Sequence, residues 1–184
     1  MKIIVGVSGA SGVVMSRTLL AALDRAGCET HLVMTDAARR TWELETGESA
    51  DALLSLAHEV YDARDMAARI SSGSFVTDGM IVLPCSMKTL AGIVSGYTDN
   101  LLLRAADVCL KENRRVVLCP REMPMGRVHL RNMLAASELG CAIVPPVLTF
   151  YNGAQTVREQ INHVVGKVLL QFGIVSGDFV PWEG

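Results

Sequence analysis

The chain alternates between short apolar runs and longer amphipathic segments along most of its length. Runs such as residues 2–7 (KIIVGV) and 115–120 (RVVLCP) are rich in apolar and β-branched residues, which is typical of strands buried on both faces. The segments between them place apolar residues three and four positions apart, which predicts helices. Strands that alternate with helices predict an α/β domain with a mostly parallel sheet covered on both faces.

The pattern predicts five strands and seven helices within one domain, residues 1–184. We expect strands at residues 2–7, 29–35, 78–86, 115–120 and 141–146. We expect helices at residues 13–27, 36–46, 49–59, 86–94, 99–113, 126–140 and 156–174. Ser49 is the expected N-cap of the third helix.

The first strand ends in GVSGASG, with glycines at positions 6, 9 and 12. Ligands of parallel sheets bind at the carboxyl ends of the strands, where Gly9, Ala10 and Ser11 can present N–H groups and a hydroxyl to a phosphate or a flavin edge. The spacing differs from the dinucleotide fingerprint, so the turn is also compatible with simple strand-to-helix punctuation. Asp36 follows the second strand, where an acidic side chain can bind a ribose. A nicotinamide dinucleotide therefore stays an alternative ligand.

Three later strand ends also carry polar groups. Residues 86–89 (SMKT) bring hydroxyls and a lysine to the start of a helix, which suits an anion or the polar edge of a ring, although the lysine is also compatible with a surface role. Arg121 and Glu122 can clamp a phosphate and hold an acid beside it, or form an exposed ion pair. Tyr151, beyond the last strand, can offer its phenol to the same cavity or cap the structure.

Composition narrows the functional classes. Lys and Arg number 17 and Asp and Glu number 19, which gives no electrostatic footprint for nucleic acid or an anionic membrane. No apolar run approaches the roughly 20 residues that span a bilayer, and the first residues do not resemble a signal peptide. Five cysteines without a C-x-x-C pair predict buried reduced thiols in a cytoplasmic protein. The four scattered histidines show no ligand spacing, so we expect no metal site.

Several motifs taken together resemble one known family. They are GVSGASG, ETHLVMT, ISSGSF, TDGMIVLPCSMKTLAGI, DNLL, RAADVCLKE, LCPREMP, HLRNM and VPPVLTFYN. The set closely resembles the UbiX-type flavin prenyltransferases, which include members labelled phenylacrylic or aromatic acid decarboxylases. The resemblance runs from Lys2 to Trp182, and its most specific block is Ser71 to Lys111. It implies a Rossmann-like or flavodoxin-like three-layer sandwich that binds FMN. It also implies a homo-oligomer, commonly a dodecamer, with active sites at subunit interfaces.

The resemblance further implies a reaction. A dimethylallyl group from dimethylallyl phosphate is joined to reduced FMN at N5 and C6, and the prenylated FMN is passed to a UbiD-type decarboxylase. Many prenyltransferases bind Mg²⁺ through a D-D-x-x-D motif, which this sequence lacks, since residues 62–65 (DARD) hold two aspartates. We therefore expect a metal-independent reaction, which is consistent with a monophosphate leaving group, while the sequence leaves the choice between a monophosphate and a diphosphate donor open.

The resemblance assigns roles by position. It assigns flavin binding to Gly9, Ala10, Ser11, Thr35, Ser86, Met87, Lys88, Thr89 and Arg121. It assigns the prenyl phosphate to Lys111, Arg121, Glu122, Tyr151 and Lys167, places Glu45 and Arg104 near the interface site, and lets Trp182 close over the flavin. The catalytic candidates are Glu122, Lys111, Tyr151 and Ser11, with Glu122 as a proton carrier.

Two departures and two alternatives qualify this assignment. Thr35 replaces a usual serine and keeps the hydroxyl, whereas Lys167 stands where arginine is usual and keeps the charge without the bidentate fork. One alternative is an FMN-dependent enzyme similar to the cysteine decarboxylases, whose P-x-M-N-x-x-M-W signature is absent here. The other is a non-enzymatic carrier of prenylated FMN, which would use the same pocket.

Overall fold

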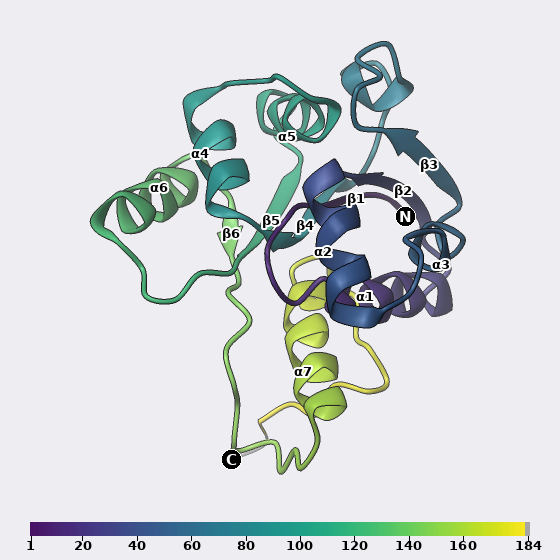
Figure 1. Ribbon diagram of the computed structural model, residues 1–184, viewed down its shortest axis with the longest axis vertical. Coiled ribbons are helices and arrows are strands. Elements are labelled where there is room, and N and C mark those ends of the chain that lie inside the picture. Colours follow the sequence, from purple (N-terminus) through teal and green to yellow (C-terminus); the bar gives the residue numbers. More distant parts are fainter. Residues whose placement is uncertain (183–184) are drawn as a thin grey trace.

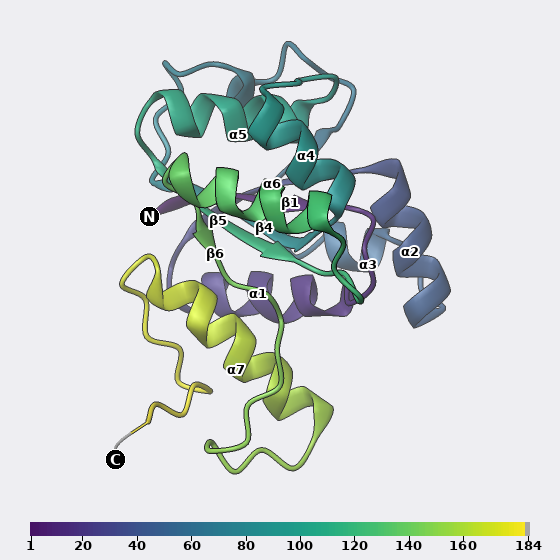
Figure 2. The same cartoon turned by 90° about the vertical axis from the view of Figure 1, so that its left-hand side faces the viewer.

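The computed structural model describes residues 1–182, and within them six parallel strands form one sheet between layers of helices (Figure 1, Figure 2). The strands are β1 (Lys2–Val7), β2 (Glu29–Met34), β3 (Glu59–Asp62), β4 (Gly79–Cys85), β5 (Arg115–Pro120) and β6 (Ala142–Ile143). Their spatial order is β3-β2-β1-β4-β5-β6, and every neighbouring pair is parallel. This is the strand order of the Rossmann fold.

Two layers of helices cover the sheet. The helices are α1 (Val14–Arg25), α2 (Asp36–Thr46), α3 (Asp51–Leu54), α4 (Met87–Ser95), α5 (Leu101–Lys111), α6 (Arg127–Glu138) and α7 (Val157–Leu170). Figure 2 shows α4, α5 and α6 on one side of the sheet and α1 and α7 on the other. The predicted three-layer α/β sandwich is therefore confirmed. Within residues 1–182, no helix combines the length and the apolar character needed to cross a membrane.

The sheet divides the apolar core in two. Ile3, Val5 and Val7 belong to the cluster that includes residues of α1 and α7, whereas Ile4 belongs to the cluster with residues of α4 and α5. This alternation follows from the two-residue period of a strand, which points successive side chains to opposite faces. Each of these side chains is almost fully buried, which contributes roughly 1.5–3 kcal/mol per residue to folding.

The segment after α2 differs from the sequence prediction. The helix expected at residues 49–59 covers Asp51–Leu54, and Glu59 begins the edge strand β3, which was not predicted. The N-cap of helix α3 is Ala50 rather than the predicted Ser49. The Ser49 hydroxyl instead accepts the Asp51 N–H at 3.3 Å. Strand β3 has one buried residue in four, so its hydrophobic pattern is too weak to identify it.

Strand β6 and helix α7 are also shorter than predicted. The strand expected at residues 141–146 covers Ala142–Ile143, because Pro145 and Pro146 lack the N–H groups that a ladder needs. The last helix, expected to reach residue 174, ends at Leu170, and Gly173 follows with a φ of +71°. The shorter strand releases residues 144–156 as an irregular segment, which carries Tyr151.

The strand order creates a crevice at one edge of the sheet. From β1 the chain first adds β2 and β3 on one side, and it then crosses to add β4, β5 and β6 on the other. The loops that follow β1 and β4 therefore diverge toward opposite faces of the sheet. Ligands of such sheets bind at this switch point, beyond the carboxyl ends of the strands.

Candidate functional site

A cavity of about 320 Å³ lies at this switch point. It is lined by residues that follow three neighbouring strands: Gly9 after β1, Thr35 after β2, and Ser86 with Thr89 after β4. Asn100, at the start of α5, completes one wall. We call this cavity the cap pocket, because its polar walls are the first residues of helices.

Three helices direct their N-termini to the cap pocket. Thr35 caps α2 by accepting the Ala38 N–H at 3.2 Å. Ser86 caps α4 and Asn100 caps α5 in the same way. The N-terminus of a helix carries partial positive charge and free N–H groups, so three of them around one cavity favour an anion such as a phosphate.

Buried contacts hold the glycine turn against these helices. The Ser8 hydroxyl donates to the Pro84 carbonyl at 3.0 Å and accepts the Ser86 N–H at 2.7 Å, which ties the end of β1 to the end of β4. A β-carbon at Gly9 would lie 2.6 Å from that of Ala37, so glycine lets this turn approach α2. Ser8 sits inside the GVSGASG motif, but the motif alone does not predict this contact with β4.

Glu45 also supports the glycine turn. Both of its carboxylate oxygens accept the Gly12 N–H, at 3.1 and 3.0 Å, and Gly12 has a φ of +93°. In this chain Glu45 therefore lies beside the turn that carries Ser11. Its expected position near an interface site remains a prediction.

The charged residues at the cap pocket form two ion pairs. Arg64 pairs with Asp36, the residue considered above for a ribose contact, and this bond raises the pKa of the guanidinium. Lys88 lies 3.7 Å from Asp99 with its side chain largely exposed. Residues 1–182 contain no cluster of three or more His, Cys, Asp or Glu side chains that could hold a metal ion.

A second cavity, of about 390 Å³, lies between β6, the segment after it and α7. Tyr151, His163 and Lys167 line it together, so the tyrosine and the lysine that the resemblance assigns to the prenyl phosphate lie at one cavity. We call it the phenol pocket. Trp182 packs edge-on against the Tyr151 ring, with centroids 5.3 Å apart, so the tail aromatic residue lies beside the phenol.

Arg121 and Glu122 lie in a third place, a hollow of about 630 Å³ after β5. The Arg121 N–H donates to the Cys85 carbonyl at 3.1 Å, which fixes the loop against β4. The Glu122 carboxylate accepts the Met123 N–H at 3.0 Å. No ion pair joins Arg121 to Glu122 among the described residues.

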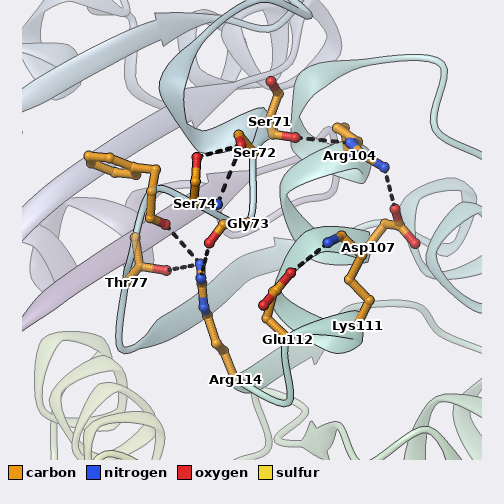
Figure 3. Close-up of polar contacts among 11 residues, drawn as sticks. Ser71, Ser72, Gly73, Ser74, Thr77, Arg104, Asp107, Lys111, Glu112 and Arg114 are labelled. Atoms are coloured by element: carbon orange, nitrogen blue, oxygen red, sulfur yellow. Dashed lines mark hydrogen bonds and ion pairs between the residues drawn. The ribbon is translucent and has the colours of Figure 1, made fainter.

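Arg104 and Lys111 belong to a fourth group, on the outer side of α5 (Figure 3). Arg104 donates to the Ser71 carbonyl at 3.1 Å and to Asp107 at 2.7 Å. Lys111 pairs with Glu112 at 2.6 Å, next to the loop that contains Gly73. Since α5 ends where β5 begins, Lys111 lies toward the amino ends of the strands, away from the cap pocket.

One chain therefore does not assemble the complete predicted set. Of the nine residues assigned to the flavin, Gly9, Thr35, Ser86, Lys88 and Thr89 line one cavity, whereas Arg121 lines the hollow after β5. Lys111, Glu122 and the pair Tyr151–Lys167, which were expected around one phosphate, line separate places. A site that uses all of them requires residues from more than one subunit, as the resemblance implies.

The structure adds residues that the sequence analysis did not single out. Asn100 was part of the DNLL motif, and its capping role follows from its residue type. Arg64 carries no sequence signal, because it reaches Asp36 across 28 positions. His163 stands four residues before Lys167 on α7, and this helical spacing places both side chains on one face.

Comparison with known proteins gives the family. A family model described as Flavoprotein matches residues 1–172. Flavin prenyltransferase UbiX from Escherichia coli (strain K12) is 53% identical over 186 residues, which cover 100% of this chain and 98% of that protein.

Two solved structures are also similar over the full length of this chain. A dodecameric FMN-dependent UbiX-like decarboxylase from Escherichia coli O157:H7 matches with a TM-score of 0.97 and 54% identity, covering 100% of both chains. AnUbiX (PadA1), solved in complex with FMN and dimethylallyl pyrophosphate, matches with a TM-score of 0.97 and 48% identity, covering 100% of this chain and 97% of that one. The chain thus belongs to the flavoprotein family and, within it, to the UbiX-like flavin prenyltransferases.

Proposed function

We propose that this protein is a flavin prenyltransferase, which joins the dimethylallyl group of dimethylallyl phosphate to reduced FMN at N5 and C6. The observation that carries the proposal is the cap pocket, in which three helix N-termini meet the glycine turn, in a chain 53% identical to a flavin prenyltransferase. The pocket provides the anion site that a flavin mononucleotide needs.

The cap pocket fits the phosphorylated arm of FMN. Thr35, Ser86 and Thr89 supply hydroxyls at helix N-termini, where a phosphate is stabilised by N–H groups and by the helix dipoles. A volume of about 320 Å³ suits one phosphorylated arm better than a dinucleotide. The ring system then extends along the turn of residues 9–11, with Met87, Lys88 and Arg121 as further flavin contacts.

The phenol pocket fits the prenyl phosphate. Lys167, an exposed residue, supplies an ammonium group and Tyr151 a half-exposed phenol, which together stabilise the charge that builds on a departing phosphate. The Trp182 ring, edge-on to Tyr151, offers a π face near the allylic carbon, where positive charge develops. AnUbiX, a relative of the same fold, was solved with FMN and dimethylallyl pyrophosphate together.

A complete site then requires a homo-oligomer. Helix α6 exposes Val128 and Leu134, and the segment after β6 exposes Val147, Leu148 and Phe150. Apolar patches of this kind mark protein–protein contact surfaces. The relative from Escherichia coli O157:H7 is dodecameric, which supports the same assembly here. Neighbouring copies would bring Arg104, Lys111 and Glu122 to the flavin and the prenyl phosphate.

The reaction breaks the bond between the allylic carbon and the phosphate oxygen. N5 of reduced FMN would replace the phosphate on the allylic carbon and lose its proton. The double bond of the attached group would then take up a proton, and its tertiary carbon would join C6, which loses a proton as the ring closes. Glu122 is the proposed acceptor of this proton, directly or through the released phosphate. Lys111 and Lys167 offset the negative charge of the phosphate and Tyr151 donates a hydrogen bond to it, so we expect the reaction to proceed without a metal ion.

The proposed function also implies a recipient for prenylated FMN and a cellular location for this protein. We propose that prenylated FMN passes to a UbiD-type decarboxylase, which uses it to decarboxylate an aromatic acid. A cytoplasmic location is consistent with five free cysteines, each of them buried.

The proposal is tested by anaerobic incubation of the flavin-free protein with reduced FMN, dimethylallyl phosphate and a chelator. We expect the extracted flavin to gain the mass of one dimethylallyl unit. Unchanged FMN that stays bound would favour the carrier. Oxidation and decarboxylation of a cysteine-containing peptide, with no prenylation, would favour the cysteine-decarboxylase-like enzyme.

A further inference from the structure

His163 is a buried histidine in the phenol pocket, for which neither the sequence analysis nor the proposed reaction has a role. It lies on α7, and 4% of its surface is exposed. The ring of Phe179 stacks on its imidazole, with centroids 5.1 Å apart and planes at 30°. The Tyr151 ring meets its edge, with centroids 5.6 Å apart and planes at 83°. The imidazole is therefore held between two aromatic rings.

The hydrogen bonds of His163 are asymmetric. Its Nε2 lies 3.5 Å from the Tyr151 hydroxyl oxygen, at the long limit of a hydrogen bond. Its Nδ1 is buried and has no partner among residues 1–182. Burial, and secondarily the charge of Lys167, lowers the pKa of the imidazole, which favours the neutral ring with one N–H group.

The position of that proton decides what the phenol can do. A proton on Nδ1 would leave a buried N–H donor without an acceptor, and orphaned buried N–H groups are rarer than under-used acceptors. A proton on Nε2 instead donates to the Tyr151 oxygen. The phenol then keeps its own O–H free, and this group can donate to an anion in the pocket that Lys167 also lines.

We propose that His163 is a positioning residue that donates from Nε2 to the Tyr151 hydroxyl oxygen and so directs the phenol O–H toward the prenyl phosphate. The proposal rests on the proposed function, because that function supplies the anion. It differs from a purely structural role, since it requires a donor at the Nε2 position and not merely a ring of the right size.

The chain after α7 keeps the imidazole in place. Gly166 leaves room for Phe179, because a β-carbon at this position would overlap the Phe179 ring. Asp178, next to Phe179, pairs with Arg25 of α1 at 2.9 Å. The tail therefore anchors the ring that stacks on His163.

Two substitutions of His163 separate the effect of its hydrogen-bond donor from the effect of the space that its side chain fills. In His163→Gln the side-chain amide can place an N–H near the former Nε2, whereas His163→Leu fills similar space without a donor. We expect His163→Leu to weaken dimethylallyl phosphate binding to the FMN-loaded protein by about tenfold, the scale of one hydrogen bond to a charged group, and His163→Gln to stay within about threefold of the parent. FMN affinity should stay unchanged in both.

The same pair in the Tyr151→Phe background tests whether His163 acts through the phenol. We expect no further loss from His163→Leu there, because the oxygen that it orients is gone. Equal losses in Leu and Gln variants, or the same loss with and without the phenol, would overturn the proposal. If His163→Leu does not fold, His163→Met, which also lacks a donor, replaces it in both backgrounds, and its loss must again depend on the Tyr151 phenol.

The titration also separates this proposal from the proposed function. It measures binding of dimethylallyl phosphate and requires no turnover. A parent protein that binds this ligand without prenylating FMN would contradict the proposed reaction, while the dependence of binding on His163 would still support or overturn the positioning role.

Discussion

Lys167 and Tyr151 place a flexible cation and a phenol in the same cavity, separate from the helix N-termini that surround the cap pocket. Lysine offers a compact charge on a long stem, whereas arginine offers a planar fork that holds two phosphate oxygens. The two cavities therefore predict that prenyl phosphate binding and FMN binding respond separately to single substitutions.

We expect Lys167→Ala to weaken dimethylallyl phosphate binding by about 1.5–3 kcal/mol, the scale of a hydrogen bond to a charged group. Lys167→Arg should preserve or tighten binding, because the fork is restored without loss of charge. Tyr151→Phe should cost less than Lys167→Ala, since it removes one neutral donor. Calorimetric titration of each FMN-loaded variant measures these differences, and Lys167→Ala that binds like the parent would contradict the assignment.

His31 predicts a pH dependence of stability. It is fully buried, with Nδ1 2.8 Å from the Tyr61 hydroxyl and Nε2 2.9 Å from Glu29. Burial lowers the pKa of this imidazole, against the opposing effect of Glu29. Below about pH 6.5 the unfolded chain binds a proton that the folded protein does not, so the free energy of unfolding falls until the pH reaches the lowered folded pKa.

We expect His31→Gln to flatten this dependence. Urea unfolding of the parent at pH 8.0, 7.0, 6.0 and 5.5 should show stability decreasing below about pH 6.5, and the variant should lose less over the same interval. His163 also titrates with a lowered pKa but remains in both proteins, so the difference reports on His31. Parallel pH profiles for the two proteins would show that His31 does not contribute.

At the scale of secondary-structure elements, a helix N-cap can stabilise its helix and can also line a ligand site, and two caps of this chain allow the two effects to be measured separately. Ser86 caps α4 at the cap pocket, where its hydroxyl accepts the Thr89 N–H at 3.2 Å. Thr156 caps α7 in the same way, through the Glu159 N–H at 3.2 Å, and does not line the cap pocket. The two caps have similar local geometry and different surroundings.

We expect Ser86→Ala and Thr156→Ala each to lower the free energy of unfolding by about 1 kcal/mol, as the loss of an N-cap does. Only Ser86→Ala should also weaken FMN binding, because its hydroxyl lies at the phosphate end of the pocket. Thermal unfolding and FMN titration of both variants measure the two effects. A loss of FMN affinity in the Thr156 variant, or none in the Ser86 variant, would contradict the placement of FMN in the cap pocket.

The elements that could be predicted from the sequence are those with strong patterns. Strand β4 is apolar throughout and β1 is apolar after Lys2, and α5 and α7 show clear helical periodicity, so their positions followed from hydrophobic spacing. Strand β3 was missed because an edge strand needs little apolar surface. The cap pocket could be expected from polar strand ends, whereas the Arg64–Asp36 pair and the Tyr151–His163 contact depend on tertiary packing and leave no local signal.

At the scale of the whole molecule, the candidate residues are distributed over separate surfaces of one chain. Lys111 lies at the end of α5, and Lys167 lies on α7 across the sheet (Figure 2). An oligomer with closed symmetry can bring such surfaces together from different copies. The proposed active site therefore depends on assembly.

This dependence predicts complementation between inactive subunits. Lys111→Ala and Lys167→Ala should each have little prenyltransferase activity as a homo-oligomer. Co-expression of the two variants with different tags should restore part of the activity in the mixed assembly, because some sites then receive both intact lysines. Mixed assemblies that stay inactive, although both variants assemble normally, would show that one subunit must supply both residues.

The central claim is that this chain catalyses prenylation of FMN and does not only hold the product. The most direct measurement follows prenylated FMN and inorganic phosphate together, under anaerobic conditions, with reduced FMN and dimethylallyl phosphate in large excess over protein. We predict that both products rise in equal amounts and exceed one equivalent per subunit. Unmodified FMN without phosphate release, or phosphate release without prenylated flavin, would contradict the claim.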